Sequence, residues 1–161
     1  MNLARDYNVT VIPAENEAPF ADVLKKFETL GFNYLSHGVV SADKDVSVYF
    51  SNSRWGKIYE EKSLGDKDPS LHFIEQENRV MFPWSSIEKS EVMSLRQETC
   101  NIEDGISIYA HASDGGGVVL GLGVKKREDM ARLAWNFPKS EIKQAMEELM
   151  SVHQEVKDHQ A

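Results

Sequence analysis

The sequence predicts one α+β domain in which helices cover a mostly antiparallel sheet. The chain has 161 residues, enough for a single domain with a sizeable core. Its strand-like segments come in neighbouring pairs with helical segments between the pairs, unlike the regular strand–helix alternation of a parallel sheet. The clearest hairpin signal is the glycine-rich turn from Ser113 to Gly117, which lies between two apolar segments.

Four elements are expected in the first third of the chain. A short strand covers Val9–Ile12, and two longer strands cover Phe32–Ser41 and Val46–Ser51. Between the first and second strands, Pro19 opens an amphipathic helix that Gly31 ends. The apolar residues of this helix recur at helical spacing: Phe20, Val23, Leu24, Phe27 and Leu30.

A second helix is expected from Asn52. A loop over Leu64–Lys67 follows it, and Asp68 then has the character of an N-cap with Pro69 at the first helical position. One face of the second helix carries the apolar and aromatic residues Trp55, Ile58 and Tyr59.

The rest of the chain is expected to alternate strands and helices. A strand at Arg79–Trp84 precedes a helix at Ser86–Thr99, and a hairpin follows. Two helices then complete the chain, separated by Pro138. The hairpin strands cover Gly105–Ala112 and Val118–Val124, and the helices cover Arg127–Asn136 and Lys139–His159.

The last helix carries an apolar stripe with two possible partners. The stripe packs on the sheet of the same chain, or it pairs with a second copy as a short coiled coil. Its residues step by three and four: Ile142, Ala145, Leu149, Val152 and Val156.

Composition places the chain among soluble globular proteins. Hydrophobic residues make up 41% and charged residues 27%, and the net charge is −8. Because an acidic chain repels phosphate backbones, non-specific binding of nucleic acid is not expected. The single cysteine, Cys100, excludes an internal disulfide and fits a reducing compartment. Since no apolar segment is long enough for a bilayer or a signal core, we expect a cytoplasmic protein without membrane contact.

Motifs for enzymatic chemistry are not found in the sequence. The glycine cluster around Gly115 fits neither a dinucleotide nor a phosphate loop, and no serine lies in a nucleophile elbow. Cys100 has no motif around it, so we expect an inert thiol rather than a nucleophile. The histidines lack metal-ligand spacing, and no metal or cofactor is expected: His37, His72, His111, His153 and His159.

Aromatic residues and one carboxylate form the main candidate binding site. Trp55 and Tyr59 share a helix face, and Asp68 and Trp84 follow. An apolar wall with a few polar groups is what a small-molecule pocket needs. The same residues also suit an ordinary core in which Asp68 only caps a helix.

The spacing of these residues resembles the autoinducer-binding domain of LuxR-type quorum-sensing regulators. Tyr59 lies four residues after Trp55, Asp68-Pro69 follows thirteen after that tryptophan, and Trp84 and Gly105 come next in order. The segment from Gly31 to Tyr34 is similar to the family's entry into its first strand. The resemblance covers about residues 20–160, nearly the whole chain.

The resemblance implies both a fold and a function. The fold would be a three-layer α-β-α sandwich around a five-stranded antiparallel sheet, with an acyl-homoserine lactone between the sheet and one helical layer. Trp55 would donate to the lactone carbonyl, and Asp68 would accept the amide N–H. Tyr59 and Trp84 would wall the pocket. The positions that flank the ring or the acyl chain in the family correspond to Leu71, Ile102, Ser107 and Gly121.

The sequence departs from the family at two places. Members of the family carry a Tyr-Pro pair before the tryptophan, and the tyrosine of that pair binds the acyl carbonyl. This sequence lacks the pair: Asn52 is followed directly by Ser53-Arg54-Trp55. Either Ser107 or Ser53 replaces that tyrosine, or the ligand differs. The Leu-Thr-x-Arg-Glu signature of the family's DNA-binding helix-turn-helix domain is also missing. Residues 1–161 are therefore expected to form one sensor domain that makes no direct DNA contact.

Three functions remain open from the sequence. The first is a quorum-type sensor that binds an acyl-homoserine lactone or a similar amphiphile and signals through dimerisation. The second is a decoy with an altered or empty pocket that forms a heterodimer with a full-length regulator and so lowers its avidity for DNA. The third, an enzyme acting on lactones or amides, is disfavoured because no nucleophile–base pair or metal set is visible.

Overall fold

A computed structural model describes residues 7–13, 18–72, 74, 80–86, 90–113 and 116–160. One sheet runs through the fold in the strand order β1-β3-β2-β6-β5-β4. Its strands are β1 (Asn8–Val11), β2 (Tyr34–Val40), β3 (Asp45–Phe50), β4 (Met81–Pro83), β5 (Asp104–His111) and β6 (Gly117–Val124).

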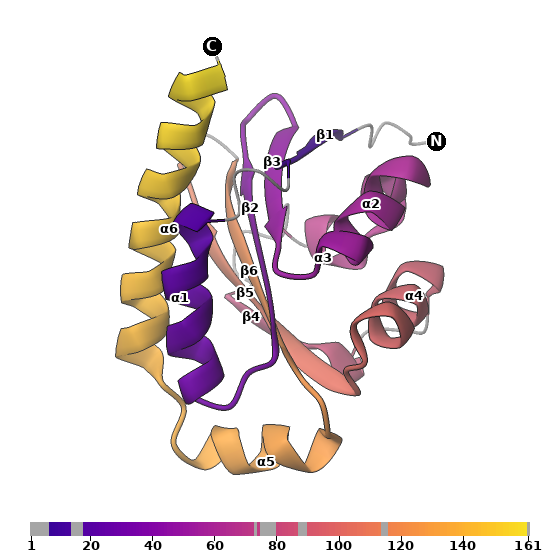
Figure 1. The fold of residues 1–161 in the computed structure, drawn as a ribbon, viewed down its shortest axis with the longest axis vertical. Coiled ribbons are helices and arrows are strands. Elements are labelled where there is room, and N and C mark those ends of the chain that lie inside the picture. Colours follow the sequence, from indigo (N-terminus) through magenta and orange to yellow (C-terminus); the bar gives the residue numbers. More distant parts are fainter. Residues whose placement is uncertain are drawn as a thin grey trace.

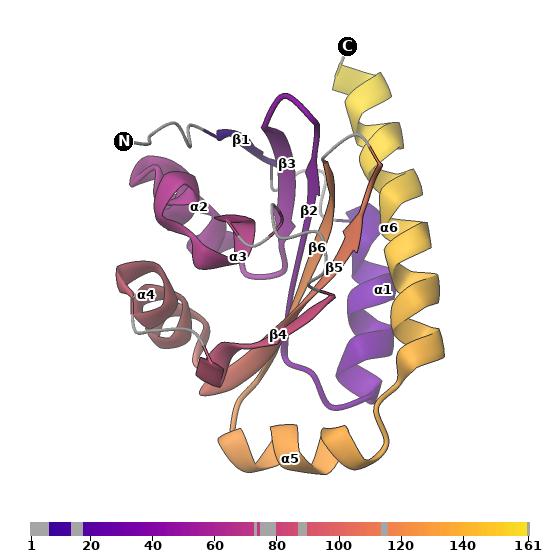
Figure 2. The same ribbon diagram turned by 180° about the vertical axis from the view of Figure 1, so that it is seen from behind.

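Helices cover both faces of this sheet, as Figures 1 and 2 show. α1 (Ala18–Thr29) and α6 (Lys139–Gln160) lie on one face, and α2 (Ser53–Glu61), α3 (Pro69–His72) and α4 (Glu91–Cys100) lie on the other. α5 (Arg127–Trp135) crosses one end of the sheet. The expected three-layer α-β-α arrangement is therefore confirmed.

The sheet has six strands in this structure, so the five-stranded antiparallel sheet implied by the family resemblance is wrong in strand number. The additional strand, β1, joins the edge of the sheet and runs parallel to β3, with Val9 opposite Val46. All other neighbouring strands in the sheet are antiparallel. A parallel neighbour needs a long connection, and α1 with β2 supplies it between β1 and β3.

Local capping explains where the helices on the site face begin. Asn52 Oδ1 accepts from the backbone N–H of Trp55 at 2.9 Å and so starts α2 where it was expected. Ser90 Oγ accepts from the N–H of Met93 at 3.2 Å, which starts α4 at Glu91, later than the predicted Ser86. Residues 87–89 of that prediction lie outside the described residues.

Two expected features differ in detail. The expected loop Leu64–Lys67 is a turn of 3₁₀ helix, η2, and a second 3₁₀ turn, η4, covers Trp84–Ser86. The β5–β6 hairpin forms as expected and pairs Ser107 with Gly121, although residues 114 and 115 of its turn lie outside the described part of the chain.

The two sheet faces contain separate hydrophobic cores. The stripe of α6 packs on the sheet of its own chain, because Ile142, Ala145 and Leu149 are buried in the same cluster as Leu120 and Leu122 of β6. Val152 packs against the edge of this cluster, and the side chain of Val156 lies outside the described residues. The structure therefore confirms sheet packing, one of the two alternatives for this stripe.

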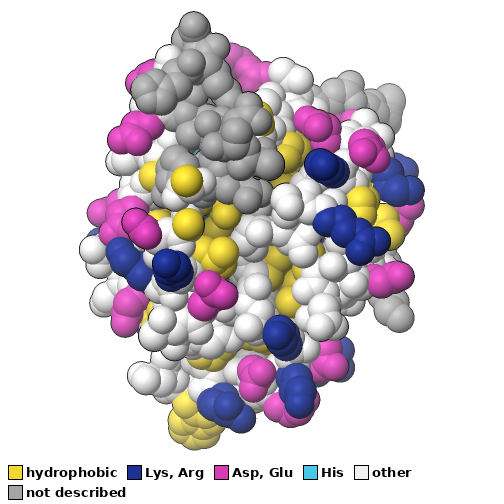
Figure 3. Space-filling view, viewed as in Figure 1, with side chains coloured by type: hydrophobic (Ala, Val, Ile, Leu, Met, Phe, Trp, Pro, Cys, Tyr) yellow, Lys and Arg dark blue, Asp and Glu magenta, His cyan; other side chains and the backbone are white. Residues whose placement is uncertain are grey.

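Figure 3 shows the distribution of charge over the described residues of one face of the molecule. Acidic and basic side chains are interspersed there, and no extended basic patch is visible among the described residues of that face. None of the described helices combines the length and the apolar character needed to cross a membrane.

A buried histidine pair joins β2 to α6. The rings of His37 and His153 lie 4.8 Å apart between centroids, and the Oγ of Ser47 lies 3.4 Å from His153 Nδ1. The imidazole of His37 has no hydrogen-bond partner on either nitrogen. Burial lowers the pKa of His153 to about 4 and holds the pKa of His37 well below 6.5.

Acid is expected to destabilise the fold through this pair. Both histidines bind a proton near pH 6.5 in the unfolded chain and only at lower pH in the folded one. Stability is therefore complete above about pH 6.5 and falls toward pH 4, by on the order of 1 kcal/mol per pH unit for each histidine. Urea unfolding of the wild type and of His153→Gln between pH 7.5 and 5 measures the slope. An equal slope in the variant would contradict this prediction.

Candidate functional site

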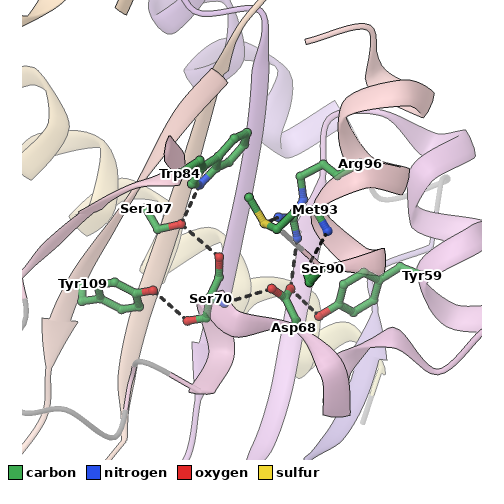
Figure 4. A network of polar contacts seen from close by, with 9 residues as sticks. All are labelled: Tyr59, Asp68, Ser70, Trp84, Ser90, Met93, Arg96, Ser107 and Tyr109. Atoms are coloured by element: carbon green, nitrogen blue, oxygen red, sulfur yellow. Dashed lines mark hydrogen bonds and ion pairs between the residues drawn. The ribbon is translucent and has the colours of Figure 1, made fainter. Parts of the chain in front are cut away.

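The residues singled out by the sequence meet on the sheet face that α2, α3 and α4 cover. Tyr59 comes from α2, Asp68 precedes α3, and Ser107 points from β5 toward them (Figure 4). Strand alternation explains the placement of Ser107, because its neighbours Ile106 and Ile108 belong to the core of the opposite face. We call the group Tyr59, Asp68, Ser70, Trp84, Arg96 and Ser107 the Asp68 site.

Asp68 is the centre of this site and is 4% exposed. Its Oδ1 accepts from the backbone N–H of Ser70 at 3.0 Å, so it does cap α3. Its Oδ2 accepts from the hydroxyl of Tyr59 at 2.8 Å and from Nη2 of Arg96 at 3.0 Å. The helix-cap and binding-site interpretations of Asp68 are thus compatible, because each uses a different carboxylate oxygen.

Arg96 on α4 is a central residue that the sequence analysis missed. Its guanidinium carbon lies 5.4 Å from the ring centroids of both Trp55 and Trp84, within the range of cation–π attraction. Nη1 donates to the sulfur of Met93 at 3.2 Å, and the buried Nε has no hydrogen-bond partner. The guanidinium is therefore held by one strong ion pair and two aromatic faces.

The surroundings of the ion pair favour the charged form of Arg96. Burial by itself lowers the pKa of Arg96 and is the largest single effect. The charge and hydrogen bond of Asp68, together with the nearby Tyr34 and Tyr59, outweigh burial and raise this pKa above its usual value. Burial, with the charge of Asp68, also raises the pKa of Tyr59 well above 10, so this phenol stays neutral and can donate its proton to the carboxylate. The result is a charged pair with no net charge, sealed from solvent.

A second group of hydrogen bonds fixes the sheet side of the site. The indole N–H of Trp84 donates to Ser107 Oγ at 3.0 Å, and the hydroxyls of Ser70 and Ser107 lie 3.1 Å apart. The hydroxyl of Tyr109 donates to the carbonyl of Ser70 at 2.9 Å. These contacts, drawn in Figure 4, tie α3 and η4 to β5.

Gly105 lets Trp84 lie against the sheet, and Gly121 makes room for Ser36. A Cβ on Gly105 would come within 2.5 Å of the Trp84 ring, and a Cβ on Gly121 would overlap Ser36 Oγ. Gly121, a predicted ligand neighbour, thus borders the site beside Trp84 through its lack of a side chain. Gly105 is required for close packing, because a Cβ there would also meet the carbonyl oxygen of Leu122.

Trp55 is fully buried, and its indole N–H has no hydrogen-bond partner. The ring packs edge-on against Phe50 and Tyr59, at centroid distances of 6.2 and 5.7 Å. An orphaned buried donor is uncommon in a folded protein and identifies a place where an acceptor would be stabilising.

The cavity at the site is small. Its volume is about 30 Å³, room for a few water molecules at most, whereas ligand pockets usually measure about 300–1,000 Å³. Tyr59, Asp68, Leu71, Trp84 and Arg96 line it, together with residues of β2 and β3. An amphiphile can enter only if side chains move.

The structure places the remaining predicted residues less directly. Ile102 is buried in the same core but does not line the cavity; its methyl group packs beside Gly123. Ser53, one of two candidates to replace the missing family tyrosine, is exposed on α2. The other, Ser107, is buried but already engaged with Trp84 and Ser70.

A signal for Arg96 did exist in the sequence. Val92, Met93 and Arg96 are the buried residues of α4 and share a face by helical spacing, so a cation lies where an apolar residue is expected. Buried charges are rare unless paired, and Asp68 was the available acidic partner.

Other reactive groups do not form a site. Within the described ranges, no three histidine, cysteine or acidic side chains gather as metal ligands. Burial raises the pKa of the Cys100 thiol to about 12, which leaves it protonated and unreactive near neutral pH.

The fold matches solved structures of LuxR-family autoinducer-binding domains. The N-acylhomoserine-lactone-dependent LuxR-family transcription factor CepR2 from Burkholderia cenocepacia is 18% identical, with a TM-score of 0.67 over 86% of this chain and 88% of that one. Escherichia coli SdiA is 15% identical with a TM-score of 0.63 over 88% of this chain, which spans 63% of SdiA. The VqsR ligand-binding domain from Pseudomonas aeruginosa is 14% identical, with a TM-score of 0.57 over 87% and 99% of the two chains.

At sequence identities of 14–18%, the structural similarity to these proteins establishes the fold alone. The resemblance to LuxR-type autoinducer-binding domains is confirmed at that level, over most of the chain. No protein-family model matches the sequence, and no curated protein matches it.

Removing the charge of Asp68 is expected to be strongly destabilising. Asp68→Asn leaves the Arg96 guanidinium buried without a counter-charge, and such changes cost about 3–5 kcal/mol of unfolding free energy. Urea unfolding measures the loss. The control Lys67→Gln breaks the exposed pair with Glu91 and should cost less than about 1 kcal/mol. Similar losses in both variants would contradict the central role of the buried pair.

Proposed function

We propose that this chain is a LuxR-type sensing domain that binds an acyl-homoserine lactone or a related amphiphile between the sheet and the α2–α4 layer. The observation that carries the proposal is the convergence of Trp55, Asp68, Trp84 and Ser107 on one buried site of this fold. All four are polar or aromatic groups that can orient a head group, and the surrounding core is apolar enough for an acyl chain.

Two neighbours in structure support the ligand class. CepR2 is described as dependent on N-acylhomoserine lactone, and SdiA has been solved in complex with octanoyl-rac-glycerol. Both molecules pair a small polar head with an apolar or acyl part. In this chain the unpartnered indole N–H of Trp55 would donate to a head-group carbonyl, and Asp68 would accept an N–H or O–H.

The proposed signal is a change in assembly. A ligand buried in the core stabilises the folded domain by linkage, and a better packed α2–α4 layer would favour a dimer. We place the whole sensing activity in residues 1–161 as one domain of a bacterial quorum-sensing regulator in the cytoplasm. The proposal concerns ligand binding at the Asp68 site and does not include DNA binding.

A decoy is the second candidate function. The cavity of about 30 Å³ favours it, because a site already filled by side chains needs no ligand to be stable. Such a protein would pair with a related full-length regulator, and the resulting heterodimer would contact a palindromic DNA site through one reader only.

Thermal unfolding against a panel of acyl-homoserine lactones tests the sensor. A ligand at 100 times its dissociation constant adds about 2.7 kcal/mol, which raises Tm by about 5–10 °C for a domain of this size. A rise for one range of acyl lengths is the expected result. A cooperative melt that no lactone or acylglycerol shifts would contradict the sensor and favour the decoy.

Trp55→Phe tests the proposed head-group contact. The variant keeps an aromatic ring against Phe50 and Tyr59 but removes the indole donor. The smaller ring leaves a gap in a fully buried place, so we expect a loss of stability from packing but none from the N–H, which has no partner within the protein. Ligand binding to the folded variant should weaken by about 1 kcal/mol or more. Titration calorimetry measures the affinity. Parental affinity in a folded variant would show that Trp55 does not contact the ligand.

Sedimentation of the purified chain, with and without ligand, distinguishes the two modes of assembly. The sensor is expected to shift toward dimer when ligand is added. A monomer–dimer equilibrium that ligand leaves unchanged would contradict signalling through dimerisation.

A further inference from the structure

We infer that Arg96 is a built-in substitute for the ligand head group: its guanidinium fills the polar half of the Asp68 site and must leave before a neutral head group can bind. The inference rests on the proposed function, which names Asp68 as the acceptor of a ligand N–H. It concerns the one charged side chain that α4 places in the site.

The contacts of Arg96 are those expected of a head group. Its Nη2–H reaches Asp68 Oδ2 at 3.0 Å, where a ligand amide would donate. Its planar guanidinium faces Trp55 and Trp84 at 5.4 Å from each centroid, as a flat ring would. The guanidinium thus contacts the carboxylate acceptor and the two aromatic rings that a bound lactone would contact.

Volume supports the same conclusion. With Arg96 in place, the cavity measures about 30 Å³. Beyond Cβ, an arginine side chain has as many non-hydrogen atoms as a lactone ring with its carbonyl oxygen. Loss of that side chain would free space of the size that the head group needs, next to the acceptor and the indole walls.

Arg96 takes the place of the head group only in part, so a ligand can in principle displace its side chain. Arg96 Nε has no partner, Nη1 has only the thioether of Met93, and the indole N–H of Trp55 has none. A guanidinium has no acceptor atom, so it cannot satisfy the Trp55 donor, whereas a ligand carbonyl can. Arg96 therefore satisfies the Asp68 acceptor and leaves the indole N–H of Trp55 unpaired.

Arg96→Ala is the test, with Met146→Ala as the matched control. Met146 is buried in the core of the opposite sheet face, so its truncation makes a cavity away from the site. We expect Arg96→Ala to lower Tm and to bind N-octanoyl-homoserine lactone more tightly than the wild type, by about tenfold or more in Kd. Met146→Ala should lower Tm without gaining affinity. Wild-type affinity equal to or tighter than that of Arg96→Ala would overturn the inference and leave the sensor function standing.

Methylguanidinium provides a readout that needs no lactone. Added at millimolar concentration, it should raise the Tm of Arg96→Ala by several degrees over the same concentration of sodium chloride, and leave Met146→Ala unchanged. The lactone should compete with this rescue. No rescue would overturn the inference, whereas rescue without lactone binding to any variant would overturn the proposed function instead.

Arg96→Gln guards against a variant that does not fold. Its amide can still donate to Asp68, but it lacks the cation and part of the volume. If Arg96→Ala stays unfolded even with methylguanidinium, Arg96→Gln should still bind the lactone more tightly than the wild type. Equal or weaker binding would overturn the inference.

Discussion

The buried ion pair between Asp68 and Arg96 is the interaction on which the site face of the fold depends. Two charges removed from water are tolerated only if they meet at short range and keep their hydrogen bonds. Here one carboxylate oxygen must reach both α2, through Tyr59, and α4, through Arg96, while the other caps α3. A shift of any one of these short elements would leave a buried charge or donor unpaired, so the pair specifies how all three lie on the sheet.

The two faces of the sheet are consequently stabilised in different ways. α1 and α6 pack through apolar side chains, with the histidine pair as the exception, and their position depends on shape. The α2–α4 layer combines aromatic packing with a polar network in which the indole N–H of Trp55 and the Nε–H of Arg96 are unpaired. Unpaired buried polar atoms reduce stability where they occur, and the opposite face has its own in the imidazole of His37. The two faces therefore differ in the buried ion pair and its network, and not in the presence of unpaired polar groups.

Local signals explain why most elements could be predicted from the sequence. The apolar periodicity of α1, the Asn52 cap of α2 and the glycine-rich turn between β5 and β6 each act within a few residues, so they can be read without a tertiary structure. The resemblance to the LuxR-type domain correctly indicated the three layers. The structure places Trp55, Tyr59, Asp68, Trp84 and Ser107 on one face of the sheet, and their role in binding a ligand stays a prediction. The resemblance implied one strand too few. Asn8–Val11 becomes a strand of the sheet by pairing with β3, and the free edge of β3 exists only in the folded protein.

By itself the sequence determined which segments become helices and strands, and which aromatic and acidic residues are candidates for a site, since both depend on residue type and spacing. Only the tertiary structure decided which side chains contact one another. Arg96 lies 28 residues after Asp68, and no local pattern states that these two side chains meet or that two tryptophans lie beside them. It also decided that Ser53 is exposed and Ser107 already engaged, because hydrogen bonds across a sheet depend on register and layer packing rather than on distance along the chain.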